Sequence, residues 1–126
     1  MEIRLETGED LNLVQRYGVG AVRIASIEYA SSILVMPGAP VVAWPPRSFG
    51  ELDAAHFEML AARKPQVVVL GTGRRQRFPA PQLLALLARD RIGLEIMDTA
   101  SACRTYNILA AEGRNVCAAL LMIESR

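Results

Sequence analysis

The sequence has few of the residues on which common enzyme and metal sites depend. Its 126 residues include one histidine, two cysteines and a single lysine, Lys64. One histidine cannot complete an HExxH motif, Cys103 and Cys117 are not in CxxC spacing, and no serine stands in a GxSxG motif. A P-loop is excluded because Lys64 is followed by Pro65. We therefore expect neither a bound metal nor a cofactor.

Long apolar runs and an excess of charge of one sign are also missing. The longest apolar run, Val116–Ile123, is far shorter than the roughly 20 residues of a membrane-spanning helix, so we expect no membrane insertion. Fourteen Lys+Arg against thirteen Asp+Glu leave a net charge of +1, which argues against nucleic acid as a partner. The N-terminal segment carries Glu2, Glu6, Glu9 and Asp10, which is typical of neither a signal peptide nor a mitochondrial presequence.

Two isolated cysteines do not make a disulfide framework in a chain of this size. We expect Cys103 and Cys117 to be reduced and unpaired, as in a bacterial cytoplasm. With 52% hydrophobic residues, the chain can bury a sizeable core. The length predicts a single domain over residues 1–126.

Short strands are predicted in the first half of the chain. Alternation over Val19–Ala25 places Val22 and Ile24 on one face. The segment 32–44 is typical of a hairpin, in which Gly38 follows a proline and suits a type II turn with a positive φ.

The second half combines helical spacing with unbroken apolar runs. Helices are predicted over 51–63, from Pro81 and from Thr99 to Ala111, and strands over 66–70, 93–97 and Val116–Ile123. Because a helix joins strands 66–70 and 93–97, we expect these strands to be parallel in one sheet. The predicted fold class is α/β: a single three-layer domain with a central mixed, largely parallel sheet, flanking helices and an N-terminal antiparallel hairpin region.

Polar and glycine residues follow the two parallel strands at their carboxyl ends, where open α/β sheets bind ligands. Glycines expose backbone N–H groups, and a helix N-terminus favours an anion. The same residues also suit a tight exit turn and a helix cap, and this structural reading remains open. The candidate ligand or partner site comprises Gly71, Thr72, Gly73, Arg74, Asp98, Thr99, Cys103, Arg104 and Asn107.

The histidine and one of the cysteines could be catalytic, but each also has a structural interpretation. A Cys–His dyad would need Cys103 and His56 to meet across the fold. His56 lies within the apolar stripe of its helix, which favours a half-buried packing residue, and Cys103 among alanines is typical of a small apolar filler. Trp44 is expected in the core.

Arginines offer the other candidate contacts. Arg74, Arg75 and Arg77 form a basic loop, which we expect to be solvated and paired with local carboxylates. Arg104 is expected to anchor its helix to nearby acceptors, with Asp98, Glu112 and backbone carbonyls as the candidates.

The C-terminal third is unusually dense in polar residues and resembles a known family. Residues 97–120 match the pattern MDTxAACRTYNxLxxEGRxVxAAL, with Ser101 and Cys117 as local departures. Tyr29-x-x-Ser-Ile-Leu-Val-x-Pro and the LGTG sequence at 70–73 also fit. The pattern is similar to that of the small domains of unknown function related to the mitochondrial NADH dehydrogenase (complex I) assembly factor 3. The resemblance implies a three-layer α/β fold with a mixed sheet and no established enzymatic activity.

Two functions from different classes follow. The first is a non-enzymatic assembly or adaptor module that binds other proteins, with respiratory-complex or membrane-associated assembly components among the candidate partners. The alternative is a small-molecule (anion) binding protein or an enzyme that uses the crevice at 71–73 and 98–107. The missing catalytic motifs favour the first, whereas the polar cluster keeps the second open.

Overall fold

The computed structural model describes residues 11–125. The acidic N-terminal residues, which argued against a signal peptide and a mitochondrial presequence, lie outside the described residues. The first half of the chain forms five strands and a short 3₁₀ helix: β1 (Val14–Gly18), β2 (Ala21–Ile24), β3 (Ile27–Tyr29), β4 (Ile33–Met36), β5 (Ala39–Ala43) and η1 (Phe49–Glu51). The second half alternates helices and strands: α2 (Ala54–Ala62), β6 (Val67–Gly71), α3 (Pro81–Ala88), β7 (Gly93–Met97), α4 (Thr99–Ala111) and β8 (Val116–Leu120).

The strands form two sheets. A small antiparallel sheet has the order β1-β2-β3, and a mixed sheet of five strands has the order β5-β4-β8-β6-β7. Within the larger sheet, β6 is parallel to both β7 and β8, while β4 is antiparallel to β5 and β8. The predicted parallel pair and the predicted hairpin over 32–44 are therefore confirmed.

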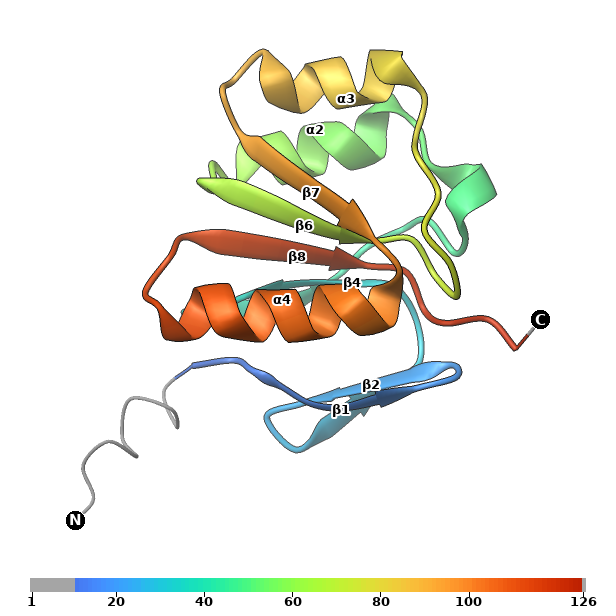
Figure 1. Cartoon of the computed structure of the whole chain (residues 1–126), viewed down its shortest axis with the longest axis vertical. Coiled ribbons are helices and arrows are strands. Elements are labelled where there is room, and N and C mark those ends of the chain that lie inside the picture. The colour runs from blue at the N-terminus through green and yellow to red at the C-terminus, as the bar shows by residue number, and fades with distance from the viewer. Residues whose placement is uncertain (1–10, 126) are drawn as a thin grey trace.

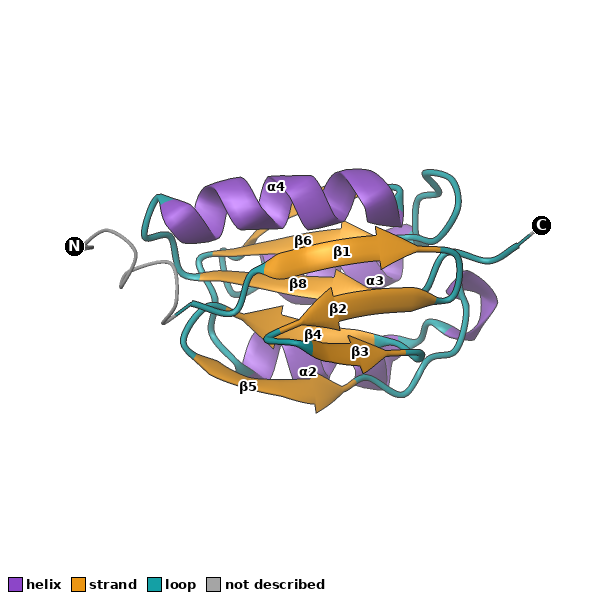
Figure 2. Ribbon diagram, turned by 90° about the horizontal axis from the view of Figure 1, so that it is seen from below, coloured by secondary structure: helices purple, strands orange, loops and turns teal. Residues whose placement is uncertain are grey.

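The elements stack in three layers, as predicted. Helices α2 and α3 cover one face of the five-stranded sheet, and α4 lies on the other (Figure 1). Viewed from below, α4 and the small sheet lie side by side on that second face (Figure 2). The fold is thus mixed α/β, with α4 in contact with both sheets.

Alternating side chains build a separate core on each face of the larger sheet. In β6, Val67 and Val69 pack on the side of α4, whereas Val68 and Leu70 pack on the side of α2 and α3. This arrangement explains why the central strands are apolar at every position: they are covered on both faces. Trp44 is 3% exposed in the α2 and α3 core, which confirms its expected place.

The small sheet was only partly predicted. The strand expected over Val19–Ala25 is β2 alone, with Val22 and Ile24 fully buried as expected. Its two partners, β1 and β3, were not predicted because they are short and mostly exposed, so they lack a run of buried residues. Val19 lies in the turn between β1 and β2 and is 64% exposed.

Three local expectations also need correction. The turn at Gly38 connects β4 to β5, but this glycine is not among those with a positive φ, so the type II geometry was wrong. The helix expected over 51–63 begins at Ala54 after the separate turn η1, because the Asp53 carboxylate caps it there. The last strand ends at Leu120 rather than Ile123.

Candidate functional site

The predicted crevice lies where the carboxyl ends of β6, β7 and β8 meet the start of α4. Here α4 approaches β6 closely, because a Cβ added at Gly71 would lie 2.9 Å from Thr99 Oγ1 and 3.0 Å from Thr99 Cα. A glycine is therefore required there by the packing of α4 on β6. The space that the sequence suggested for a ligand at Gly71 is filled by the first turn of α4.

Thr99 ties three segments together at this junction. Its hydroxyl is fully buried with the rest of the residue, donates to the carbonyl of Leu121 at 2.6 Å and accepts from the N–H of Gly73 at 2.8 Å. The Thr99 N–H in turn donates to the Gly73 carbonyl at 2.8 Å. These bonds satisfy polar groups that would otherwise be buried without partners.

The loop after β6 is held by its own side chains. Thr72 Oγ1 donates to the Arg75 carbonyl at 2.7 Å and accepts from the Arg77 N–H at 3.1 Å. The Arg74 N–H donates to a carboxylate oxygen of Glu124, which packs where a side chain of Gly73 would lie. Gly73 has a φ of 101°, which favours glycine.

Asp98 caps α4, as the sequence predicted. Its carboxylate accepts from the Ser101 N–H at 2.8 Å and from the Ser101 hydroxyl at 2.9 Å. The hydrogen bond from the Ser101 backbone N–H holds the pKa of the Asp98 carboxyl below its usual value, and burial opposes this effect.

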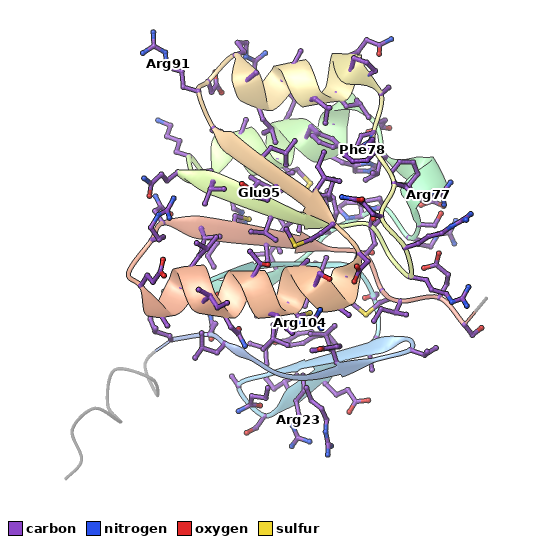
Figure 3. The ribbon with its side chains drawn as sticks, in the orientation of Figure 1. Arg23, Arg77, Phe78, Arg91, Glu95 and Arg104 are labelled. Atoms are coloured by element: carbon purple, nitrogen blue, oxygen red, sulfur yellow. The ribbon has the colours of Figure 1, made fainter. Side chains whose placement is uncertain are left out.

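Arg104 does not use the acceptors that the sequence suggested. Its guanidinium donates to Tyr17 Oη at 2.6 Å and to Ser101 Oγ at 3.2 Å, rather than to Asp98 or Glu112. The side chain lies between α4 and the small sheet (Figure 3). The expectation of direct bonds to a carboxylate was wrong because Tyr17, on a strand that was not predicted, lies within reach.

Two further residues of α4 bind the segment that enters the small sheet. Asn107 makes a matched pair of bonds to Val14, accepting from its N–H at 2.8 Å and donating to its carbonyl at 2.9 Å. Tyr106 Oη donates to the carbonyl of Asn12 at 2.6 Å. These bonds and that of Arg104 to Tyr17 connect the polar residues of α4 to β1 and the residues just before it.

The structure does not bring the two candidate dyad residues together. Cys103 is buried in the core beneath α4, whereas His56 lies on α2, on the opposite face of the sheet. Burial raises the pKa of the Cys103 thiol to about 12, which Arg104 only partly opposes. His56 Nδ1 accepts from the Asp53 N–H at 3.1 Å, and its side chain is 13% exposed, as expected for a half-buried packing residue.

The described residues hold no metal-binding cluster. Within residues 11–125, no three or more His, Cys, Asp or Glu side chains are arranged to bind a metal ion. The same part of the chain contains no helix with the length and apolar character needed to cross a membrane.

Sequence reasoning missed the contacts that place most of these groups. Tyr17, Asn12 and Val14, which bond Arg104, Tyr106 and Asn107 respectively, lie 87 to 94 residues away along the chain. The basic loop was noticed, but pairing with local carboxylates was expected for it. In residues 11–125, the guanidiniums of Arg74, Arg75 and Arg77 form no ion pair, and Glu124 bonds only the Arg74 backbone.

Comparison with protein families covers nearly all of the described chain. The model for the family described as "Protein of unknown function (DUF498/DUF598)" matches residues 14–121. The chain belongs to the DUF498/DUF598 family. This family membership confirms the resemblance noted from residues 97–120.

Members and relatives of the DUF498/DUF598 family share the fold and parts of the sequence. The crystal structure of a Bordetella parapertussis protein superposes on this one with a TM-score of 0.84. The two sequences are 39% identical, and the match covers 89% of this chain and 96% of the Bordetella chain. The NADH dehydrogenase (ubiquinone) 1 alpha subcomplex assembly factor 3 of Bos taurus is 35% identical over 83 residues, which are 64% of this chain and 45% of the relative.

A third relative has a different kind of name. The 13 kDa major membrane protein of Francisella tularensis is 31% identical over 65 residues, which are 52% of this chain and 53% of that protein. The chain thus spans about half the length of the curated relatives it matches.

We predict that Asn107→Ala lowers the free energy of unfolding by about 1–3 kcal/mol, because it leaves the N–H and carbonyl of the buried Val14 without partners. Urea denaturation measures this change. The neighbouring variant Ile108→Ala is the control, since Ile108 is 60% exposed, and it should change stability by less than about 0.5 kcal/mol. Equal effects of the two variants would contradict the role assigned to Asn107.

A second prediction concerns the thiols. Burial raises the pKa of both Cys103 and Cys117 to about 12, so the folded protein should not react with a thiol reagent at pH 8. After denaturation without reductant, two free thiols should be titrated. Unfolded thiols ionise near their ordinary pKa, so the free energy of unfolding should fall as pH rises above about 8.5. Cys103→Ala should reduce that slope, and rapid reaction of the folded protein would contradict the burial.

Proposed function

We propose that this chain is a non-enzymatic assembly or adaptor module that binds other proteins. The observation that carries the proposal is the internal use of the polar groups between Asp98 and Asn107. Their hydrogen bonds go to the capped turn, to the β6 loop and to the small sheet, and not to an open pocket. The name of the Bos taurus relative, an assembly factor, supports the same class of function.

The alternative, an anion-binding protein or enzyme using the crevice at 71–73 and 98–107, has less support. Three backbone donors that an anion would need already have acceptors: Gly73 bonds Thr99, Arg74 bonds Glu124, and Ser101 bonds Asp98. The Cys103 thiol is 1% exposed, so it is a poor candidate nucleophile.

The partners to look for are components that assemble respiratory complexes or that associate with membranes. The first class follows from the name of the Bos taurus relative, and the second from that of the Francisella relative. We further propose a cytoplasmic location, supported by two unpaired and buried cysteines.

The proposal is tested by affinity purification of the tagged full chain from its native cells after mild cross-linking. We expect one or a few proteins to be recovered in amounts comparable to that of the chain itself, and cells expressing the tag alone serve as control. Native mass spectrometry of the same material should find no bound small molecule. Recovery of a small molecule without any protein partner would contradict the proposal.

A further inference from the structure

A small pocket lies where η1, the loop after β6 and the C-terminal tail meet. It has a volume of about 150 Å³, and its lining includes Arg47, Ser48, Thr72, Arg77 and Glu124. Arg77 lies near η1 and at the same end of the molecule as the tail, whereas Arg91 lies at the far end of α3 (Figure 3). The pocket adjoins the junction of Gly71 and Thr99, because its lining includes Thr72 and Leu121, whose carbonyl accepts from Thr99.

Both arginines of the pocket keep hydrogen-bonding capacity for another group. The Arg77 guanidinium stacks on the Phe49 ring at 4.3 Å from its centroid, which orients the cation without neutralising it. Arg47 pairs with Glu51 at 3.1 Å, but the two side chains are 86% and 41% exposed. Because such an exposed pair contributes little free energy, an incoming anion can compete for Arg47.

The loop that presents Arg77 is ordered rather than loose. The bonds of Thr72 to Arg75 and Arg77 close the loop, and Gln76 Nε2 donates to the Ile96 carbonyl at 2.8 Å. Preorganised donors bind an anion at a lower entropic cost than mobile ones do.

The pocket already has a carboxylate at its edge. Glu124 lines it, and one carboxylate oxygen accepts from the Arg74 N–H at 2.9 Å. The glutamate is carried by an extended segment, because Ile123 forms a bridge with Val19 and its carbonyl accepts from the Gly20 N–H at 2.8 Å. The local backbone thus fits a carboxylate presented by an extended peptide.

We propose that this arginine pocket binds a glutamate or aspartate side chain from an acidic segment of a partner protein, in competition with Glu124. The inference rests on the proposed protein-binding function and names the chemistry of the partner. Phe78, next to Arg77, is 66% exposed and supplies an apolar contact for a neighbouring residue of that segment.

Other anions fit the same surroundings less well. Glu51 and Glu124 lie beside the two arginines and offset their charge, so the pocket lacks the excess of positive charge that favours a phosphate dianion.

The test is an NMR titration of the full chain with an acetylated and amidated hexapeptide of four glutamates and two leucines. We expect shifts confined to amides 47–50, 72–78 and 121–125, and none with the matching glutamine peptide. The double variant Arg47→Gln/Arg77→Gln should weaken binding at least tenfold, while the control Arg91→Gln should stay within twofold. Glu124→Gln should strengthen binding at least twofold, because it removes the competing carboxylate.

Several results would overturn the proposal. They are equal binding of the glutamine peptide, no binding of the acidic peptide at 5 mM, an unchanged affinity in Glu124→Gln, and binding of inorganic phosphate at the same amides with equal or higher affinity. Binding of phosphatidylglycerol vesicles that depends on both arginines, without peptide binding, would assign the surface to a membrane.

The purified double variant separates this inference from the proposed function. If wild type and double variant recover the same protein partner equally, the adaptor function stands and the arginine pocket is not its docking site. If neither recovers a protein although the acidic peptide binds wild type, the pocket chemistry stands and the adaptor function fails.

Discussion

The close approach of α4 to β6 at Gly71 is the constraint on which the rest of the structure depends. It places Thr99 where one hydroxyl can join the β6 loop to the residue after β8. With its first turn fixed there, α4 lies across the sheet and turns Arg104 and Asn107 toward the small sheet. The polar residues that suggested a ligand site therefore have two structural roles in α4. Those of its first turn join the β6 loop to the residue after β8, and the later ones bind the small sheet.

The sequence predicted the parts of the fold that depend on local signals. The strands predicted from the apolar runs at 66–70 and 93–97, and the cap of the helix that begins at Thr99, were correctly anticipated, because each is set by neighbouring residues. Contacts between distant residues were not predictable in this way. Nothing near Arg104 indicates Tyr17 as its partner, since β1 is short and exposed and gives no strand signal. Gly71, Thr72, Gly73, Asp98 and Thr99 meet at the carboxyl ends of β6 and β7, whereas Arg104 and Asn107 contact the small sheet and Cys103 is buried beneath α4, contacts that appear only in three dimensions.

The proposed adaptor function rests on the name of one relative and on the internal contacts of α4. In this chain of the DUF498/DUF598 family, Thr99 and Asn107, two of the most distinctive polar residues, make internal contacts. Within residues 11–125, the guanidiniums of Arg74, Arg75 and Arg77 form no ion pair, and Arg77 lies at the end of the molecule where the C-terminal tail leaves. Protein recognition through surface charge is consistent with both observations.

Gly71 serves the packing of α4 on β6 rather than ligand access. The most direct measurement compares urea denaturation of Gly71→Ala with that of Gly93→Ala, a glycine on the neighbouring strand where an added Cβ would meet only ordinary contacts at 3.5 Å. Gly71→Ala should lose at least about 2 kcal/mol of unfolding free energy, as overpacked core positions do, and Gly93→Ala less than about 1 kcal/mol. Equal stability of the two variants would contradict the packing role of Gly71.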